Sequence, residues 1–189
     1  MSTKITTGKV RFSYCNLVEP RKSTDGGKDK YSVTLLIPKS DKETYSKIMA
    51  AIKEAADNYR KKNGSKSLPP KPNITLHDGD GVRNESGEEF GKECKRCWVI
   101  TVTTTKPPVI YDRDRNEIDA DEVYSGCYGR AVINFAAYNH NNTKKGVSGY
   151  LVSLMKLHDG EQLGGGAVAS SSDYDDDYDY DDDYDDDVL

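Results

Sequence analysis

The sequence lacks several features that define common classes of protein. It has no apolar run that approaches the roughly 18–20 residues of a membrane-spanning helix. Its first ten residues, MSTKITTGKV, contain no apolar stretch of the kind found in secretory signals. We therefore expect a cytoplasmic protein without a membrane partner, in which the four cysteines stay reduced rather than form disulfides.

Nucleotide-binding and catalytic motifs are also missing. The sequence contains neither G-x-x-x-x-G-K-[ST] nor G-x-G-x-x-G, the glycine-rich patterns that cradle phosphates. Its three histidines, His77, His140 and His158, stand singly in predicted loops or at strand ends. Nothing in their spacing places a histidine beside a nucleophile and a carboxylate. We expect neither an enzyme nor a cofactor.

Positive charge is absent from the end of the chain. Residues 173–189 hold eleven Asp and four Tyr, and no Lys or Arg. The formal net charge of −5 hides this segment, because the other residues carry 27 Lys and Arg against 21 Asp and Glu, a net +6. Such asymmetry indicates an acidic tail with a role of its own and a basic body that can meet a polyanion.

Composition divides the chain into three regions. Residues 1–163 are long enough for one domain with a core. Residues 164–172, GGGAVASSS, are predicted to be a flexible linker. Residues 173–189 repel one another and offer little apolar surface, so we expect a disordered tail.

The acidic tail has two interpretations. In the first, the tail only keeps the protein soluble. In the second, the linker holds the tail at high effective concentration near the basic body, where the tail competes with nucleic acid. Once nucleic acid displaces it, the tail becomes available to basic partners. We favour the second. The residues that we assign to partner binding are the last nine, which end in an apolar pair: Asp181, Asp182, Asp183, Tyr184, Asp185, Asp186, Asp187, Val188 and Leu189.

One helix is predicted after Pro38. Ser40-Asp41-Lys42-Glu43 fits a capping box, and Gly64 fits a helix stop. Between them an apolar stripe recurs at intervals of three and four residues, which is typical of a helix that packs on a sheet. The stripe consists of Tyr45, Ile48, Met49, Ile52, Ala55, Ala56 and Tyr59.

Five strands are predicted over residues 9–17, 30–37, 97–105, 125–138 and 146–157. In the first, Val10, Phe12 and Tyr14 share a face that we assign to the core, and Arg11, Ser13 and Cys15 share the other. Residues 139–145 form a polar turn that makes the last two strands a hairpin, and residues 64–93 are loop-like. The fold class is mainly β: an OB-like antiparallel β-barrel with one appended helix, although here the helix follows the second long strand.

The strand over residues 125–138 carries the most informative surface. Tyr128, Arg130, Asn134 and Tyr138 alternate opposite an apolar face. Aromatic rings and cations on an exposed sheet suit single-stranded nucleic acid, because bases stack on the rings and cations pair with phosphates. The alternative is that these side chains cover a second packed layer. Residues elsewhere that add to the predicted surface are Arg11, Trp98, Lys106 and Tyr111. Tyr14 is an alternative member of this surface, although we assign its face to the core.

Two further motifs have structural interpretations. Cys94-Lys95-Arg96-Cys97 is a lone C-x-x-C, whereas a structural zinc site takes four ligands, and no cysteine or histidine elsewhere stands at a zinc-finger spacing. We predict no metal site, and a zinc module remains an alternative. Asp78-Gly79-Asp80-Gly81 lacks the spaced acids of a calcium loop, so we interpret it as a turn.

Four stretches resemble the bacteriophage single-stranded DNA-binding proteins of the Enc34 type, an OB-fold family. They are residues 30–40, 78–80, 123–135 and 156–165, within a similarity that covers most of residues 5–165. Tyr124-Ser-Gly-Cys-Tyr128 and Asp159-Gly-Glu-x-Leu-Gly-Gly165 are the specific parts.

The resemblance implies binding of single-stranded DNA during phage DNA replication, recombination or repair in the cytoplasm of a bacterial host. It also implies that the acidic tail recruits phage or host replication and recombination proteins. The alternative is an adaptor whose tail binds a basic partner and whose body has no nucleic-acid role.

Overall fold

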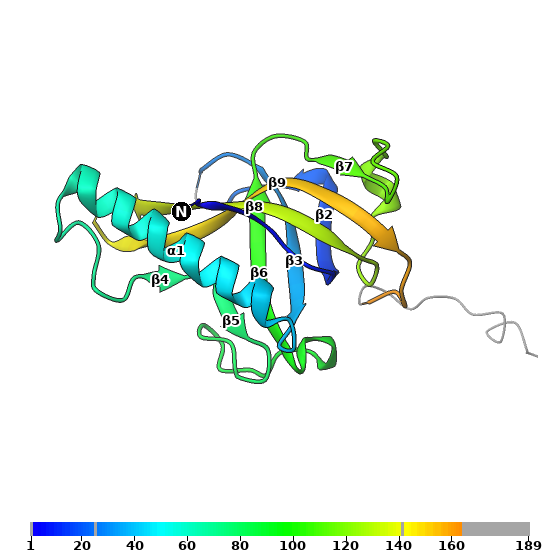
Figure 1. Cartoon of the computed structure of the whole chain (residues 1–189), viewed down its shortest axis with the longest axis horizontal. Helices are drawn as coiled ribbons and strands as arrows, with labels where there is room; N and C mark the ends of the chain where they lie inside the picture. The colour runs from blue at the N-terminus through cyan, green and yellow to red at the C-terminus, as the bar shows by residue number, and fades with distance from the viewer. Residues whose placement is uncertain (1, 25, 141, 164–189) are drawn as a thin grey trace, which may run out of the picture.

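The computed structural model describes residues 2–24, 26–140 and 142–163. Figure 1 shows a curved sheet with one long helix lying along it. The elements are β1 (Lys4–Thr6), β2 (Val10–Arg21), β3 (Lys30–Pro38), α1 (Lys42–Asn63), β4 (Asn73–Ile74), β5 (Leu76–Asp78), β6 (Cys97–Thr104), β7 (Val109–Tyr111), β8 (Tyr128–His140) and β9 (Lys144–His158), with short 3₁₀ turns at Lys92–Cys94 and Ala120–Glu122.

Five strands pair in a ring in the order β8–β2–β3–β6–β9, and β9 returns to β8. β2, β3 and β6 form an antiparallel meander, and β8 and β9 form the predicted hairpin. The link between β6 and β9 is a single parallel pair, Thr103 with Tyr150, so the ring is not a clean barrel. β4 and β7 also pair with β9 in parallel. The mainly β class with one helix is confirmed, and the order matches the partly open five-stranded barrel of OB folds.

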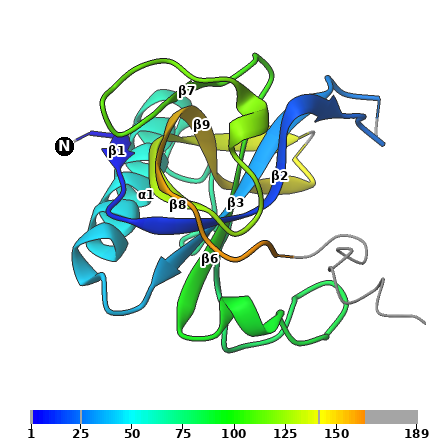
Figure 2. The same ribbon diagram turned by 90° about the vertical axis from the view of Figure 1, so that its right-hand side faces the viewer.

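The core fills the inside of the ring. Fully buried side chains from four strands meet there, among them Phe12, Leu35, Ile100 and Phe135. α1 packs against β1, β8 and β9, as its apolar stripe predicted, and lies beside β1 and β8 in Figure 2. Among the described residues no helix has the length and apolarity needed to cross a membrane.

The ends of α1 differ in detail from the prediction. Asp41, not Ser40, is the N-cap: its carboxylate accepts the Thr44 amide at 3.0 Å and the Thr44 hydroxyl at 2.6 Å. Thr44 is buried, and its hydroxyl also accepts the Gly8 amide, at 2.8 Å. Met49, assigned to the apolar stripe, is exposed instead.

A bulge in β2 reverses the predicted facing of two residues. Ser13 pairs with Thr34 and Asn16 with Ser32, so β2 holds one extra residue between those pairs. Tyr14 takes a positive φ of 45° and turns outward, with 59% of its surface exposed. Cys15 then turns inward and packs on the core. The assignment of Tyr14 to the core and of Cys15 to the other face was therefore wrong, because period-two alternation does not survive a bulge.

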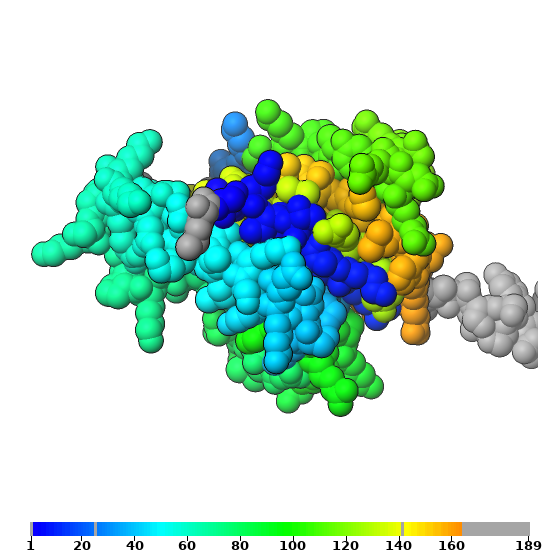
Figure 3. Space-filling view, in the orientation of Figure 1, coloured from blue at the N-terminus to red at the C-terminus, as the bar shows by residue number. Residues whose placement is uncertain are grey.

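The segment predicted as loop-like, residues 64–93, also contains two strands, β4 and β5. The β5–β6 connection folds over the outer face of β3 and β6, where Leu36, Phe90, Cys94 and Val99 form a second, smaller apolar cluster. In Figure 3 the green residues of this region project beneath the cyan start of α1. The second cluster fixes the connection to the sheet beside the site described next.

Candidate nucleic-acid interface

The outer face of the meander presents rows of side chains that run across the strands. Residues opposite one another in a sheet point to the same side. One row is Ser13, Thr34 and Thr101, in which the two threonine hydroxyls lie 2.8 Å apart. The neighbouring row passes through Leu36 and Val99, which carry the second apolar cluster.

A groove of about 600 Å³ lies over these rows. Its floor comes from β3 and β6, and its walls come from the β2 bulge, the β8–β9 hairpin, β4, β5 and the β5–β6 connection. The lining residues are Tyr14, Thr34, Asn73, Ile74, His77, Arg83, Asn84, Glu85, Ser86, Phe90, Cys94, Val99, Thr101 and Tyr138.

Two tyrosines from different strands line this groove. Tyr14 projects from the β2 bulge, and Tyr138 comes from the end of β8, where its ring lies 5.4 Å from the ring of His140. A non-glycine residue in the left-handed region costs about 1–3 kcal/mol, and such strain concentrates at functional sites. The bulge therefore holds Tyr14 outward at a cost to stability.

The β5–β6 connection adds a cation and a third ring. The Arg83 guanidinium lies 4.7 Å from the centre of the Phe90 ring, and the centre of the His77 ring lies 6.4 Å from it. Stacking on Phe90 orients the planar guanidinium. The groove lining thus combines aromatic rings and hydroxyls with one guanidinium, that of Arg83, and one carboxylate, that of Glu85.

Of the eight residues predicted to bind DNA, only Tyr138 lines this groove. Tyr128 and Arg11 lie elsewhere on the outer face, opposite each other on β8 and β2. The Tyr128 ring stacks on His158 at 4.7 Å, with the Arg11 guanidinium at 5.3 Å and the Lys9 ammonium at 5.7 Å. We call these four residues the Tyr128 platform. Tyr138 follows Tyr128 by ten positions in β8, about 33 Å along a strand. Alternation assigned both side chains to one face, but the curved strand carries them apart.

Two of the remaining predicted residues lie together at another surface. Tyr111 and Arg130 line a small concavity of about 90 Å³ between β7, β8 and β9. The Arg130 Nε donates to the Thr7 carbonyl at 2.8 Å. Asn134, also on β8, accepts the Thr3 hydroxyl at 2.9 Å.

The last two residues occupy different surroundings. Trp98 is partly buried on the core side, where it stacks on Tyr45 of α1 at 4.8 Å. Lys106 is exposed on the connection between β6 and β7.

The two specific motifs of the resemblance contact each other. The Tyr124 hydroxyl donates to Asp159 at 3.0 Å and accepts the Gly160 amide at 3.1 Å, while Lys156 forms an ion pair with Asp159 at 2.8 Å. These contacts begin a strap, residues 159–163, that lies against Ser125, Gly126 and the Arg11 side chain of β2.

Arg11 secures the middle of the strap and Leu163 its end. Arg11 donates to the carbonyls of Gly126, at 3.1 Å, and Glu161, at 2.7 Å. The Leu163 amide donates to Ser125 at 2.8 Å, and its side chain packs on the second apolar cluster, which includes the groove-lining Phe90. The described chain therefore ends beside the groove.

Gly126→Ala is expected to loosen the strap. Gly126 has a φ of 118°, and a Cβ there would lie 2.0 Å from the Glu161 carbonyl oxygen. Gly64→Ala is the matched control, because Gly64 also has a positive φ, 99°, but nothing within 4 Å of its Cβ. Hydrogen exchange at the Leu163 amide should accelerate in Gly126→Ala only. Equal behaviour of the two variants would show that the close approach does not hold the strap.

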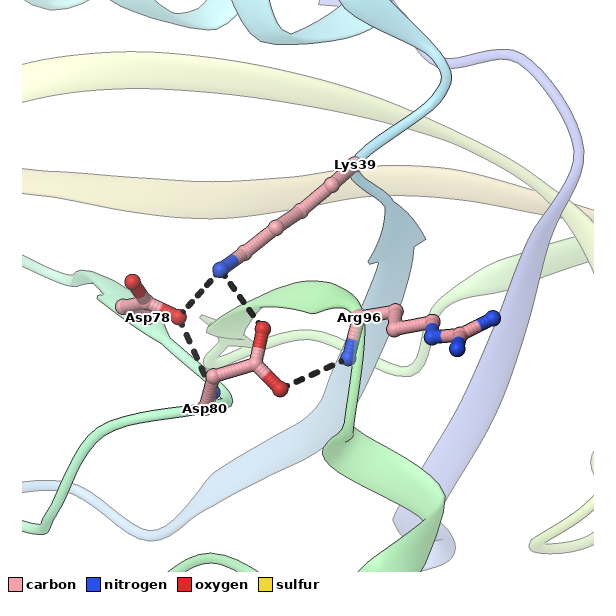
Figure 4. Close-up of polar contacts among 4 residues, drawn as sticks. All are labelled: Lys39, Asp78, Asp80 and Arg96. Atoms are coloured by element: carbon pink, nitrogen blue, oxygen red, sulfur yellow. Dashed lines mark hydrogen bonds and ion pairs between the residues drawn. The ribbon is translucent and has the colours of Figure 1, made fainter.

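The Asp-Gly-Asp turn is an ion-pair cluster that we call the clasp, formed by Lys39, Asp78 and Asp80 (Figure 4). The Lys39 ammonium lies 2.6 Å from Asp78 Oδ1 and 2.7 Å from Asp80 Oδ2. These hydrogen bonds hold the pKa of both carboxyls below the ordinary value and raise the pKa of Lys39. Asp80 Oδ1 also accepts the Arg96 amide at 3.0 Å. The interpretation of this motif as a turn is confirmed.

Cys94 and Cys97 flank the turn that precedes β6. Burial raises the pKa of the Cys94 thiol to about 11 and also raises that of Cys97. Protonated thiols are poor metal ligands and poor nucleophiles. Within residues 2–24, 26–140 and 142–163, no three His, Cys, Asp or Glu side chains gather in a way that could hold a metal ion.

Several groove residues were missed by the sequence analysis. Tyr14 was considered for the surface but assigned to the core, and Arg83 and Phe90 fell in a segment predicted only as loop. The available signal was compositional: an aromatic and a cation within a glycine-rich connection between strands. The predicted tail residues, Asp181 to Leu189, lie outside the described residues.

Comparisons with known proteins identify the family of the chain. Putative protein p50 of Acyrthosiphon pisum secondary endosymbiont phage 1 is 32% identical over 180 residues, which cover 92% of this chain and 93% of that protein. The single-stranded DNA-binding protein of bacteriophage Enc34, solved in complex with single-stranded DNA, is 30% identical with a TM-score of 0.71, over 86% of this chain and 90% of that one.

A more distant structure shares the fold alone. The single-stranded DNA-binding protein gp2.5 of bacteriophage T7 aligns with a TM-score of 0.57 at 14% identity, over 88% of this chain and 98% of that one. The family model described as Enterobacter phage Enc34, ssDNA-binding protein matches residues 3–189. The chain therefore belongs to the Enc34 single-stranded DNA-binding protein family.

Proposed function

We propose that this protein binds single-stranded DNA without strong sequence preference, in the groove between the β2 bulge and the β8–β9 hairpin. The observation that carries the proposal is the groove itself, in which Tyr14 and Tyr138 lie over a hydroxyl-lined floor on the β3–β6 face. This face is where OB folds bind oligonucleotides. The relative from phage Enc34, whose structure contains single-stranded DNA, supports the same ligand.

The groove chemistry accounts for tolerance of sequence. Every base has an aromatic face, so stacking on Tyr14 and Tyr138 supplies affinity without reading base edges. Arg83 and the net positive charge of the body pair with phosphates. The Tyr128 platform, with Lys9 and Arg11 beside its ring, offers a second stacking surface on the same outer face of the sheet.

The acidic tail completes the proposal. Residues 173–189 compete with DNA for the basic body and, once DNA displaces them, bind replication or recombination proteins of the phage or its bacterial host. The strap supports this arrangement, because Leu163 lies beside the groove and the acidic segment follows after only nine linker residues. The setting is the host cytoplasm, during replication, recombination or repair of phage DNA.

Titration of a fluorescent dT oligomer at several salt concentrations tests the proposal. Binding should weaken steeply with salt, because log K falls by roughly 0.7 per phosphate neutralised for each unit of log salt concentration. A salt-independent affinity would contradict the phosphate contacts. Absence of any binding at low salt would favour the adaptor alternative, in which the body has no nucleic-acid role.

A further inference from the structure

The β5–β6 connection supplies six of the fourteen residues that line the groove: Arg83, Asn84, Glu85, Ser86, Phe90 and Cys94. The antiparallel pairing of β5 with β6, in which Asp78 lies opposite Trp98, brings the two ends of this connection together. The clasp lies where those ends meet. Asp80, near the start of the connection, accepts the amide of Arg96, the last residue of the connection, at 3.0 Å.

Backbone bonds reinforce the same junction. Gly79 donates to the Cys97 carbonyl at 2.9 Å, and Lys39 donates its amide to the Arg96 carbonyl at 2.9 Å. A Cβ at Gly79 would lie 2.0 Å from the Cys94 carbonyl oxygen, so only glycine allows this approach. The end of β3, the end of β5 and the start of β6 are thereby joined at one point.

Lys39 is the one side chain that contacts both carboxylates of the junction in the part of the chain that the structure describes. Its ammonium also lies 4.9 Å from the centre of the Trp98 ring, which fixes its position from a second side. Figure 4 shows it between Asp78 and Asp80, while the Arg96 guanidinium points away from them. Without Lys39, two neighbouring carboxylates would repel each other at the base of a wall that faces a polyanion.

We propose that Lys39 and Asp80 are positioning residues for single-stranded DNA: the clasp closes the base of the β5–β6 connection and holds Arg83 and Phe90 in the groove. The inference rests on the proposed function and adds residues that do not touch the ligand. Loss of the clasp lowers the fraction of protein whose groove is formed, and apparent affinity falls by that fraction.

Lys39→Met in the full chain tests this role. Apparent affinity for a dT oligomer should fall about tenfold, as for a groove formed about a tenth of the time. The slope of log K against log salt should stay that of the wild type, since no phosphate contact is lost. Hydrogen exchange of amides in residues 82–91 should accelerate without DNA. Lys39→Arg, which keeps the charge, should restore most of the affinity.

Two further variants separate the possible outcomes. Lys47→Met is the matched control, because it removes an exposed Lys–Glu ion pair of 2.8 Å on α1, away from the groove. Asp80→Ala keeps Lys39 but removes the acceptor of the Arg96 amide. It should also accelerate hydrogen exchange of the amides in residues 82–91.

Three results would overturn the inference. Unchanged affinity of Lys39→Met would do so while leaving the proposed function intact. A salt slope reduced by about 0.7 would make Lys39 a direct phosphate ligand instead. A wild-type protein that fails to bind would overturn the proposed function itself, and this inference with it.

Discussion

Replacing Tyr14 and Tyr138 together with alanine is expected to weaken binding of a dT oligomer by about a hundredfold. Each base stacked on an aromatic ring contributes about 1–3 kcal/mol, and about 1.4 kcal/mol is a factor of ten in affinity. Both rings line one groove, so one strand of DNA can meet both. Fluorescence anisotropy at fixed salt measures the loss.

Phenylalanine at the same two positions is the control. It keeps the rings and removes only the hydroxyls, so the double phenylalanine variant should bind like the wild type. Melting temperatures of both double variants show whether the fold survives. Full affinity in a folded alanine variant would place the DNA elsewhere, and Tyr128→Ala would then test the Tyr128 platform.

Single replacements inform the β2 bulge as well. Tyr14 has a left-handed backbone conformation. This conformation is strained for alanine as well as for tyrosine, but not for glycine. Tyr14→Gly should therefore lose the stacking surface while gaining stability relative to Tyr14→Ala. That comparison separates the role of the ring in binding from the strain at its backbone.

The larger elements followed from the sequence because their signals are local. Strands β3, β6 and β9 and helix α1 are marked by residue type, alternation and spacing, and the structure agrees with their predicted extents within a few residues. The order of strands in the ring does not follow from such signals. It depends on which strand edges meet, and this depends on long-range pairing that no short window records.

The candidate site was harder to predict for a related physical reason. Alternation assigns side chains to two faces of a flat strand, whereas β2 is bulged and β8 curves around the ring. The bulge sent Tyr14 outward, and the curvature separated Tyr138 from Tyr128. One wall of the groove comes from the β5–β6 connection. Lys39 and Asp80 meet at the base of this connection but are 41 residues apart in the sequence, so no local pattern predicts their contact.

Removal of residues 173–189 is expected to tighten binding of single-stranded DNA about tenfold at low salt. A tethered segment acts at an effective concentration near the millimolar range. In the competition that we propose, attraction between the eleven Asp and the basic body fills the groove for most of the time, and DNA has to displace the tail before it binds. Truncation removes the competitor and leaves every groove residue in place.

Salt distinguishes this competition from a change in the fold. The attraction between tail and body is screened over about 10 Å at 0.1 M salt, so the gain from truncation should shrink as salt rises. A full-length variant with all eleven Asp of the tail replaced by Asn keeps chain length and should match the truncation. If truncated and full-length proteins bind DNA equally, the tail does not compete, and its role lies with protein partners alone. If truncation tightens DNA binding but the Asn variant binds like the wild type, the length of the tail rather than its charge limits access. A neutral tail of equal length would then still obstruct the groove, because Leu163 lies beside it.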